Sequence, residues 1–137
     1  MRIIDKLIIH CSDTPKSMDV GAKEIGRWHE QRGFNKIGYH YVIRRDGSLE
    51  VGRMESVIGA HCFGQNRRSL GVCLVGRGEY TKKQFTALKR LSDELKNRYV
   101  GLKIKGHYSY SKKTCPMFNV EEWLSPKKIE EVNDDGG

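Results

Sequence analysis

The chain has 137 residues and a formal net charge of +8; 37% of its residues are hydrophobic, 31% are charged, 15 are glycine and 3 are proline. These values fit a single globular domain and exclude a largely disordered or collagen-like chain. No apolar run approaches the roughly 20 residues of a membrane-spanning helix, and Asp5 and Lys6 interrupt the apolar stretch that a signal peptide would need. We therefore expect synthesis in the cytoplasm and no membrane insertion.

The first two predicted elements are a strand and a helix. Residues 3–9 are short, β-branched and mostly apolar, which predicts a buried strand with His10 at its C-terminal end. Asp19 can cap a helix over residues 20–32, and Gly33 supplies a left-handed stop. One face of this helix, expected to lie on the sheet, carries Ile25, Trp28 and His29.

The middle of the chain predicts a hairpin and a further buried strand. Residues 38–44 are aromatic and β-branched, residues 45–48 form a turn because Asp-Gly tolerates positive φ, and residues 49–53 return antiparallel. Residues 60–68 are polar and form a loop before a strand over residues 69–75.

The last third predicts a long helix, a strand and a short helix. The sequence of residues 81–84 is a capping box that begins an amphipathic helix over residues 82–99. A strand over residues 102–106 is followed by an irregular segment, residues 107–118, and by a helix capped by Asn119.

These elements predict one α/β domain with a mixed central β-sheet flanked by helices, because strands alternate with helices while the hairpin excludes an all-parallel sheet. We assign the domain to residues 1–132 and a polar tail to residues 133–137.

The basic residues are concentrated in one segment. Residues 81–113 hold ten Lys or Arg residues against Asp93 and Glu94. This charge suits an anionic partner such as nucleic acid, a membrane surface or a bacterial wall polymer, and it fits a solvated helix face equally well. No nucleic-acid-reading motif accompanies it, so no specific nucleic-acid partner is expected.

The four cysteines are expected to be thiols or metal ligands in a cytoplasmic protein, although an even count permits three pairings in an exported one. They are Cys11, Cys62, Cys73 and Cys115.

Three residues after predicted strands could hold a metal ion. His10 and His107 each follow a strand, and Cys115 lies in a loop whose neighbours Lys112 and Lys113 would favour a thiolate. Two imidazoles and a thiolate could bind zinc and leave a fourth position for water. Taken alone, the spacing favours a simpler interpretation: a surface histidine, a hydrogen-bonded histidine and a buried thiol.

Several motifs considered together favour the metal site over this simpler interpretation. In chain order they are His10-Cys11-Ser12, Gly38-Tyr39-His40-Tyr41 before the Arg-Asp-Gly hairpin, Gly59-Ala60-His61 with Asn66, residues 69–76 (SLGVCLVG), Gly106-His107 and Lys113-Thr114-Cys115-Pro116. In this order and separation they resemble the type 2 N-acetylmuramoyl-L-alanine amidases, which share their fold with the peptidoglycan recognition proteins. The resemblance extends from about Ile4 to Trp123.

The resemblance implies a site with one zinc ion held by His10, His107 and Cys115, with an essential tyrosine at Tyr39 and an essential lysine at Lys113. A cation near the metal can stabilise the oxyanion that forms when water attacks an amide, and a tyrosine can help to move protons. Taken alone, Tyr39 could equally fill a strand face and Lys113 could belong to the basic surface.

The histidines of the middle segment receive different predictions. His61 is predicted to hydrogen-bond substrate at the rim of the cleft, and an exposed loop histidine is an equal alternative. His40 follows Tyr39 directly and should face the other way along the strand, so it is left out of the site.

Three positions depart from the wider family. Some relatives have an aspartate as the third metal ligand where this chain has Cys115. Some relatives have a glutamate, proposed as general base, where this chain has Cys73, so the metal and Tyr39 must serve instead. Tyr108 replaces an acidic residue after the second histidine ligand and leaves the orientation of His107 without an obvious partner. Cys11 and Cys62 match no catalytic position and are interpreted as ordinary thiols, with Cys11 packed on the strand face opposite His10.

The leading hypothesis is therefore zinc-dependent hydrolysis of the amide between N-acetylmuramic acid and L-alanine. The expected partners are peptidoglycan or muropeptides, and the expected state is a monomer. Made in the cytoplasm, the protein would act on the cell wall after release, as a phage or prophage endolysin. The alternatives are a cytoplasmic amidase that recycles muropeptides, a non-catalytic peptidoglycan-binding module and a nucleic-acid-binding protein.

Overall fold

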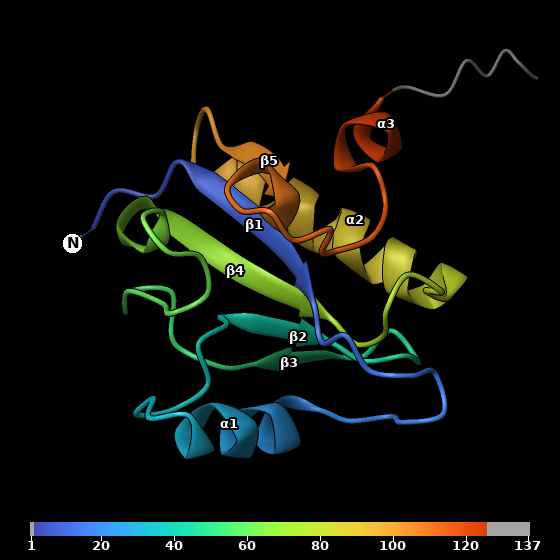
Figure 1. Cartoon of the computed structure of the whole chain (residues 1–137). Coiled ribbons are helices and arrows are strands. Elements are labelled where there is room, and N and C mark those ends of the chain that lie inside the picture. The colour runs from blue at the N-terminus through green and yellow to red at the C-terminus, as the bar shows by residue number, and fades with distance from the viewer. Residues whose placement is uncertain (1, 126–137) are drawn as a thin grey trace, which may run out of the picture.

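The computed structural model describes residues 2–125 and contains a five-stranded sheet between helices (Figure 1). The strands are β1 (Lys6–Cys11), β2 (Tyr41–Ile43), β3 (Leu49–Val51), β4 (Ser69–Leu74) and β5 (Lys103–Gly106), and their order in the sheet is β3-β2-β4-β1-β5. Only the β2–β3 pair is antiparallel, whereas β2–β4, β4–β1 and β1–β5 are parallel. The predicted mixed sheet flanked by helices is confirmed, and the tail at residues 133–137 and the domain end at residue 132 lie outside the described residues.

Alternation along the central strands sends apolar side chains to both faces of the sheet. On one face, Leu7 and Ile9 of β1 pack with Leu88 and Leu95 of α2 (Lys82–Arg98). On the other face, Val42 and Cys73 pack with Ile25 of α1 (Ala22–Gln31). Figure 1 shows α1 and α2 on opposite sides of the sheet, which gives three layers. His10 alternates with Ile9 and therefore points to the face of α1.

The long helix and the hairpin form as their local sequences predict. Thr81 Oγ1 accepts a hydrogen bond from Gln84 N at 3.1 Å, and Gln84 Oε1 accepts one from Thr81 N at 3.0 Å, which completes the capping box. Gly47 has φ of +88° in the turn between β2 and β3. Lysine and arginine side chains of α2 such as Lys82, Lys89 and Arg90 are exposed, as on a solvated helix face.

The cap of the first helix was predicted wrongly. The helix begins at Ala22 after Gly21, rather than after Asp19. Two carboxylates satisfy its free N–H groups: Gly21 N donates to Glu24 Oε1 within the first turn at 2.9 Å, and Ala22 N donates to Glu50 Oε1 at 2.7 Å. Because Glu50 lies on β3, only the tertiary structure reveals this cap.

The first strand also differs from the prediction, since it runs from Lys6 to Cys11 rather than over residues 3–9. His10 is therefore an internal strand residue paired in register with Cys73 of β4, and it is only 1% exposed. The other predicted strands are shortened by up to four residues. After β5 come a short 3-10 turn, His107–Ser109, and α3 (Val120–Leu124), whose cap Asn119 accepts from Glu122 N at 2.9 Å. No helix in the described part combines the length and the apolar composition needed to cross a bilayer.

Candidate metal centre and catalytic cleft

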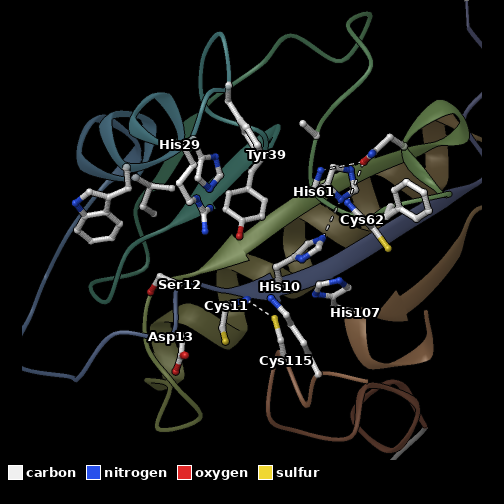
Figure 2. A pocket seen from close by; sticks show the side chains of 18 of the residues that line it. His10, Cys11, Ser12, Asp13, His29, Tyr39, His61, Cys62, His107 and Cys115 are labelled. Carbon is white, nitrogen blue, oxygen red and sulfur yellow. Dashed lines mark hydrogen bonds between the residues drawn. The ribbon is translucent and has the colours of Figure 1, made fainter. Parts of the chain in front are cut away.

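A cleft of about 1040 Å³ opens on the α1 side of the sheet, around the C-terminal ends of β1 and β5. Its lining includes His10, Tyr39, His61, His107, Lys113 and Cys115, which are all the residues that the sequence predicts for the site. Figure 2 shows His10, Tyr39, His61, His107 and Cys115 in this cleft. In parallel sheets, ligands bind at this end of the strands, where loops are free to diverge.

His10, His107 and Cys115 converge within this cleft. The nitrogen or sulfur atoms that each can offer to a metal all lie within 4.8 Å of one another. The rings of His10 and His107 have their centroids 4.4 Å apart because β1 and β5 are neighbours. The loop after His107 returns to the sheet, where Tyr108 N donates to Cys115 O at 3.0 Å, and this bond holds the thiol beside the imidazoles.

The surroundings of His10, His107 and the adjacent His61 lower the pKa of each imidazole and so favour its neutral form. Burial is the main cause that holds the pKa of His10 well below its ordinary value, followed by the adjacent His61 and His107. Burial, and next Lys113, lowers the pKa of His107. Burial lowers the pKa of His61 to about 3. A neutral imidazole is the form that binds a metal ion, so these shifts favour a metal centre.

The environment of Cys115 differs from the prediction. The hydrogen bond that the Cys115 thiol donates to the Cys11 sulfur, together with burial, raises the pKa of Cys115 in the metal-free chain, while the same bond lowers the pKa of Cys11 to about 7. The expectation that Lys112 and Lys113 lower the pKa of Cys115 is therefore wrong for the metal-free chain. The Cys11 backbone N–H also points at Cys115 Sγ at 2.9 Å, which suits a thiolate there, and a coordinated metal would deprotonate the thiol.

Tyr39 lies beside His10, with ring centroids 5.1 Å apart. Burial raises its pKa well above the ordinary value, so the phenol remains protonated and acts as a hydrogen-bond donor. Cys73 is completely buried next to it, and burial also raises the pKa of this thiol far above its ordinary value. A neutral thiol cannot replace the glutamate base of some relatives, in agreement with the sequence analysis.

The remaining predicted residues line the cleft in different ways. Lys113 is exposed in the loop that also carries Cys115. His61 is half-buried, with its Nδ1 atom 2.8 Å from His10 Nε2. Tyr108 turns away from His107, donating to Glu121 Oε1 at 2.7 Å, and among residues 2–125 no hydrogen bond reaches the His107 ring. Trp28, predicted to lie on the sheet, is 36% exposed and lines the cleft instead.

Two other predictions for the side chains near the site are confirmed. All four cysteines are free thiols. His40 is fully buried and engages backbone groups outside the cleft: it accepts from Gly71 N at 3.1 Å and donates to Val57 O at 2.8 Å.

Sequence reasoning missed the contacts that support the ligands. The approach of Cys11 N to Cys115 Sγ joins residues far apart in the chain, and no local pattern predicts it. Gly71 is different, because an isolated glycine within a strand often marks a close approach of another group. In the structure, a Cβ atom at Gly71 would lie 2.6 Å from the His61 ring.

The sheet brings two imidazoles and one thiol together in a cleft. Such a set of three protein ligands, with a fourth position open, is typical of catalytic metal sites. Comparison with known proteins narrows this class. The family model described as N-acetylmuramoyl-L-alanine amidase matches residues 1–118. The chain therefore belongs to the N-acetylmuramoyl-L-alanine amidase family, as its motifs predict, and it is an enzyme of this kind.

Phage proteins and solved structures support this assignment. The endolysin of Klebsiella phage KP32 is 40% identical over 140 residues, covering 96% of this chain and 91% of the relative. The endolysin of Escherichia phage T7 is 38% identical over 141 residues, covering 97% and 92%. The structure of N-acetylmuramoyl-L-alanine amidase LysC from Clostridium intestinale URNW superposes with a TM-score of 0.82 at 30% identity, covering 97% of this chain and 88% of that one. Drosophila PGRP-LB superposes with a TM-score of 0.79 at 27% identity, covering 98% and 87%.

Proposed function

We propose that this amidase is zinc-dependent and serves as a phage or prophage endolysin that separates stem peptides from the glycan strands of peptidoglycan. The observation that carries the proposal is the convergence of His10, His107 and Cys115 within 4.8 Å in the cleft. The similarity to phage endolysins over more than nine-tenths of both chains supports the biological role.

The donor set fits zinc. Zinc–nitrogen bonds of about 2.0 Å and zinc–sulfur bonds of about 2.3 Å place two nitrogens and one sulfur at tetrahedral positions about 3.3–3.5 Å apart, within the 4.8 Å that separates the candidate ligand atoms. Two neutral imidazoles and one thiol are ligands that zinc accepts, and three of them leave one position open, as in catalytic sites. Zinc bound there supplies a Lewis acid and lowers the pKa of a coordinated water.

The remaining roles belong to the side chains around the ligands. The protonated phenol of Tyr39 donates a hydrogen bond toward the scissile carbonyl and holds a proton for transfer. Lys113 lines the cleft, and the positive charge of its ammonium group would stabilise the oxyanion that develops on the carbonyl oxygen. Cys73 takes no part in proton transfer because its thiol is buried and neutral.

The test is hydrolysis of purified peptidoglycan followed by detection of new alanine amino termini. Native protein is compared with chelated protein, with chelated protein restored by zinc, and with Cys115→Ser. Cys62→Ser is the matched control, because this free thiol lines the same cleft but lies outside the ligand cluster. We expect activity only in the native, restored and Cys62→Ser samples. Activity that survives both chelation and Cys115→Ser refutes the zinc mechanism.

A second pair of assays tests the biological role. An endolysin should clear suspensions of bacteria whose inner membrane has been opened, and it should degrade polymeric peptidoglycan. Hydrolysis of soluble muropeptides without any action on the polymer would identify a recycling enzyme instead.

A further inference from the structure

The His61 ring is fixed in place by the chain around it. Asn66 Oδ1 accepts hydrogen bonds from His61 N at 2.9 Å and from Cys62 N at 3.0 Å, which secures the loop. Gly71 and Gly59 lie against the ring, since Cβ atoms at these positions would approach its atoms within 2.6 and 2.7 Å. Two glycines therefore leave the space in which the imidazole lies, beside His10 (Figure 2).

A chain of hydrogen bonds assigns the protons on both imidazoles. Ser69 Oγ lies 2.7 Å from Gln65 O, and because a carbonyl only accepts, the serine hydroxyl must donate to it. Ser69 Oγ then accepts from His61 Nε2, which lies 3.4 Å away. A neutral His61 with its proton on Nε2 accepts at Nδ1, so His10 Nε2, 2.8 Å away, must be the donor.

This sequence of donors leaves one atom of His10 without a proton. When the single proton of a neutral His10 imidazole lies on Nε2 and is donated to His61 Nδ1, Nδ1 of His10 has a free lone pair for a metal ion. The opposite tautomer of His61 would direct an N–H at His10 Nε2 and would place the free lone pair of His10 on the wrong nitrogen. The direction of the whole chain follows from the carbonyl of Gln65.

We propose that His61 is a positioning residue that orients His10 and fixes the tautomer in which Nδ1 is available to the metal. This inference rests on the proposed metal centre and gives His61 a role different from binding substrate at the rim. Both ring nitrogens lie within hydrogen-bond reach of protein groups, so neither is left for a ligand. Partners that orient a metal-bound histidine raise metal affinity and are typical of such centres.

The first test reads the tautomers in the native protein. Nitrogen-15 chemical shifts of the histidine rings, measured on metal-free and zinc-loaded protein, distinguish protonated from unprotonated nitrogens. We expect a proton on Nε2 of both His10 and His61 in the two samples. A proton on His10 Nδ1 in the metal-free protein overturns the inference without any variant.

The second test compares two side chains of similar shape at position 61. In His61→Asn, the amide oxygen can take the place of Nδ1 and accept from His10 Nε2, whereas His61→Leu cannot accept. Competition with a chromophoric chelator should show that His61→Leu binds zinc roughly 10–100-fold more weakly than native protein, with His61→Asn recovering much of the loss. Equal zinc affinity in the Leu variant and the native protein overturns the inference.

Kinetics separate positioning from substrate binding. At saturating zinc, the His61→Leu protein should recover activity with an unchanged KM, since its defect lies in metal affinity. A raised KM that persists at saturating zinc would instead assign His61 to the substrate.

These measurements also separate the inference from the proposed function. Zinc affinity and tautomers are read without substrate. If the native chain binds zinc and His61→Leu weakens that binding, but no alanine termini appear from peptidoglycan, the proposed function fails and the inference stands. A native chain that binds no zinc overturns both.

Discussion

His40 should make the protein less stable as the pH falls. Burial lowers its pKa from 6.5 to about 4, against a smaller opposite effect of its hydrogen bond to Val57 O. Between these two values, the unfolded chain takes up a proton that the folded chain excludes. The contribution of His40 to stability is therefore complete above pH 6.5, falls as the pH drops, and levels off below about pH 4.

The size of the effect follows from the two pKa values. Between about pH 7.5 and about pH 4.5, this site should lower the free energy of unfolding by about 2.5 kcal/mol. His40→Gln removes the titrating group, and its amide can still donate to Val57 O. The variant loses the bond to Gly71 N and should be about 1–3 kcal/mol less stable than native protein at neutral pH.

Urea unfolding of native and His40→Gln proteins at the two pH values measures the difference. Chelator is added to both proteins so that no bound metal affects their stability. The other four histidines are present in both proteins, so their contributions to the pH dependence largely cancel in the comparison. The advantage of the native protein should shrink by about 2.5 kcal/mol at the lower pH. An advantage that is the same at both pH values would show that His40 is not held neutral by burial.

Three further substitutions test two residues of the cleft and one hydrogen-bond network outside it. Tyr39→Phe should lower kcat on the order of 10²–10⁴-fold while zinc affinity by chelator competition stays unchanged; a normal kcat would remove the phenol from the mechanism. Lys113→Met should lower kcat on the order of 10²-fold, with partial recovery in Lys113→Arg, and steady-state kinetics that show no loss would contradict a role at the oxyanion. Glu55→Gln removes the charged acceptor shared by the Tyr41 and Tyr99 hydroxyls. It should lower the free energy of unfolding by about 1–3 kcal/mol in urea titrations, and zinc affinity serves as the control because it should not change.

Local sequence rules predicted the elements whose stabilising groups lie close together in the chain. Thr81 and Gln84 satisfy each other's backbone donors within one turn, so the start of α2 is visible without a fold. The turn at Gly47 likewise depends on local conformation. The cap of α1 was missed because Glu50 comes from a strand 28 residues away from Ala22.

In the site, too, the sequence predicted the residues but not the contacts between distant segments that hold them. The motifs predicted that His10, Tyr39, His107, Lys113 and Cys115 belong to one cleft, and the structure brings them there. They did not predict what holds the ligands in place. The contact of His61 with His10 spans 51 residues, and that of Cys11 with Cys115 spans 104 residues.

The sequence by itself determined the family, the mixed sheet and the identity of the candidate ligands, since motif order, hydrophobic periodicity and turn chemistry are properties of neighbouring residues. Only the tertiary structure decided that His10 lies inside β1, that Tyr108 turns away from His107, and that His61 lies against His10. These features depend on strand register and on the direction of hydrogen bonds between distant segments. The pairing of β1 with β4 and β5 sets the register of His10, whereas the hydrogen bonds of Tyr108 and His61 form only when folding brings their partners close.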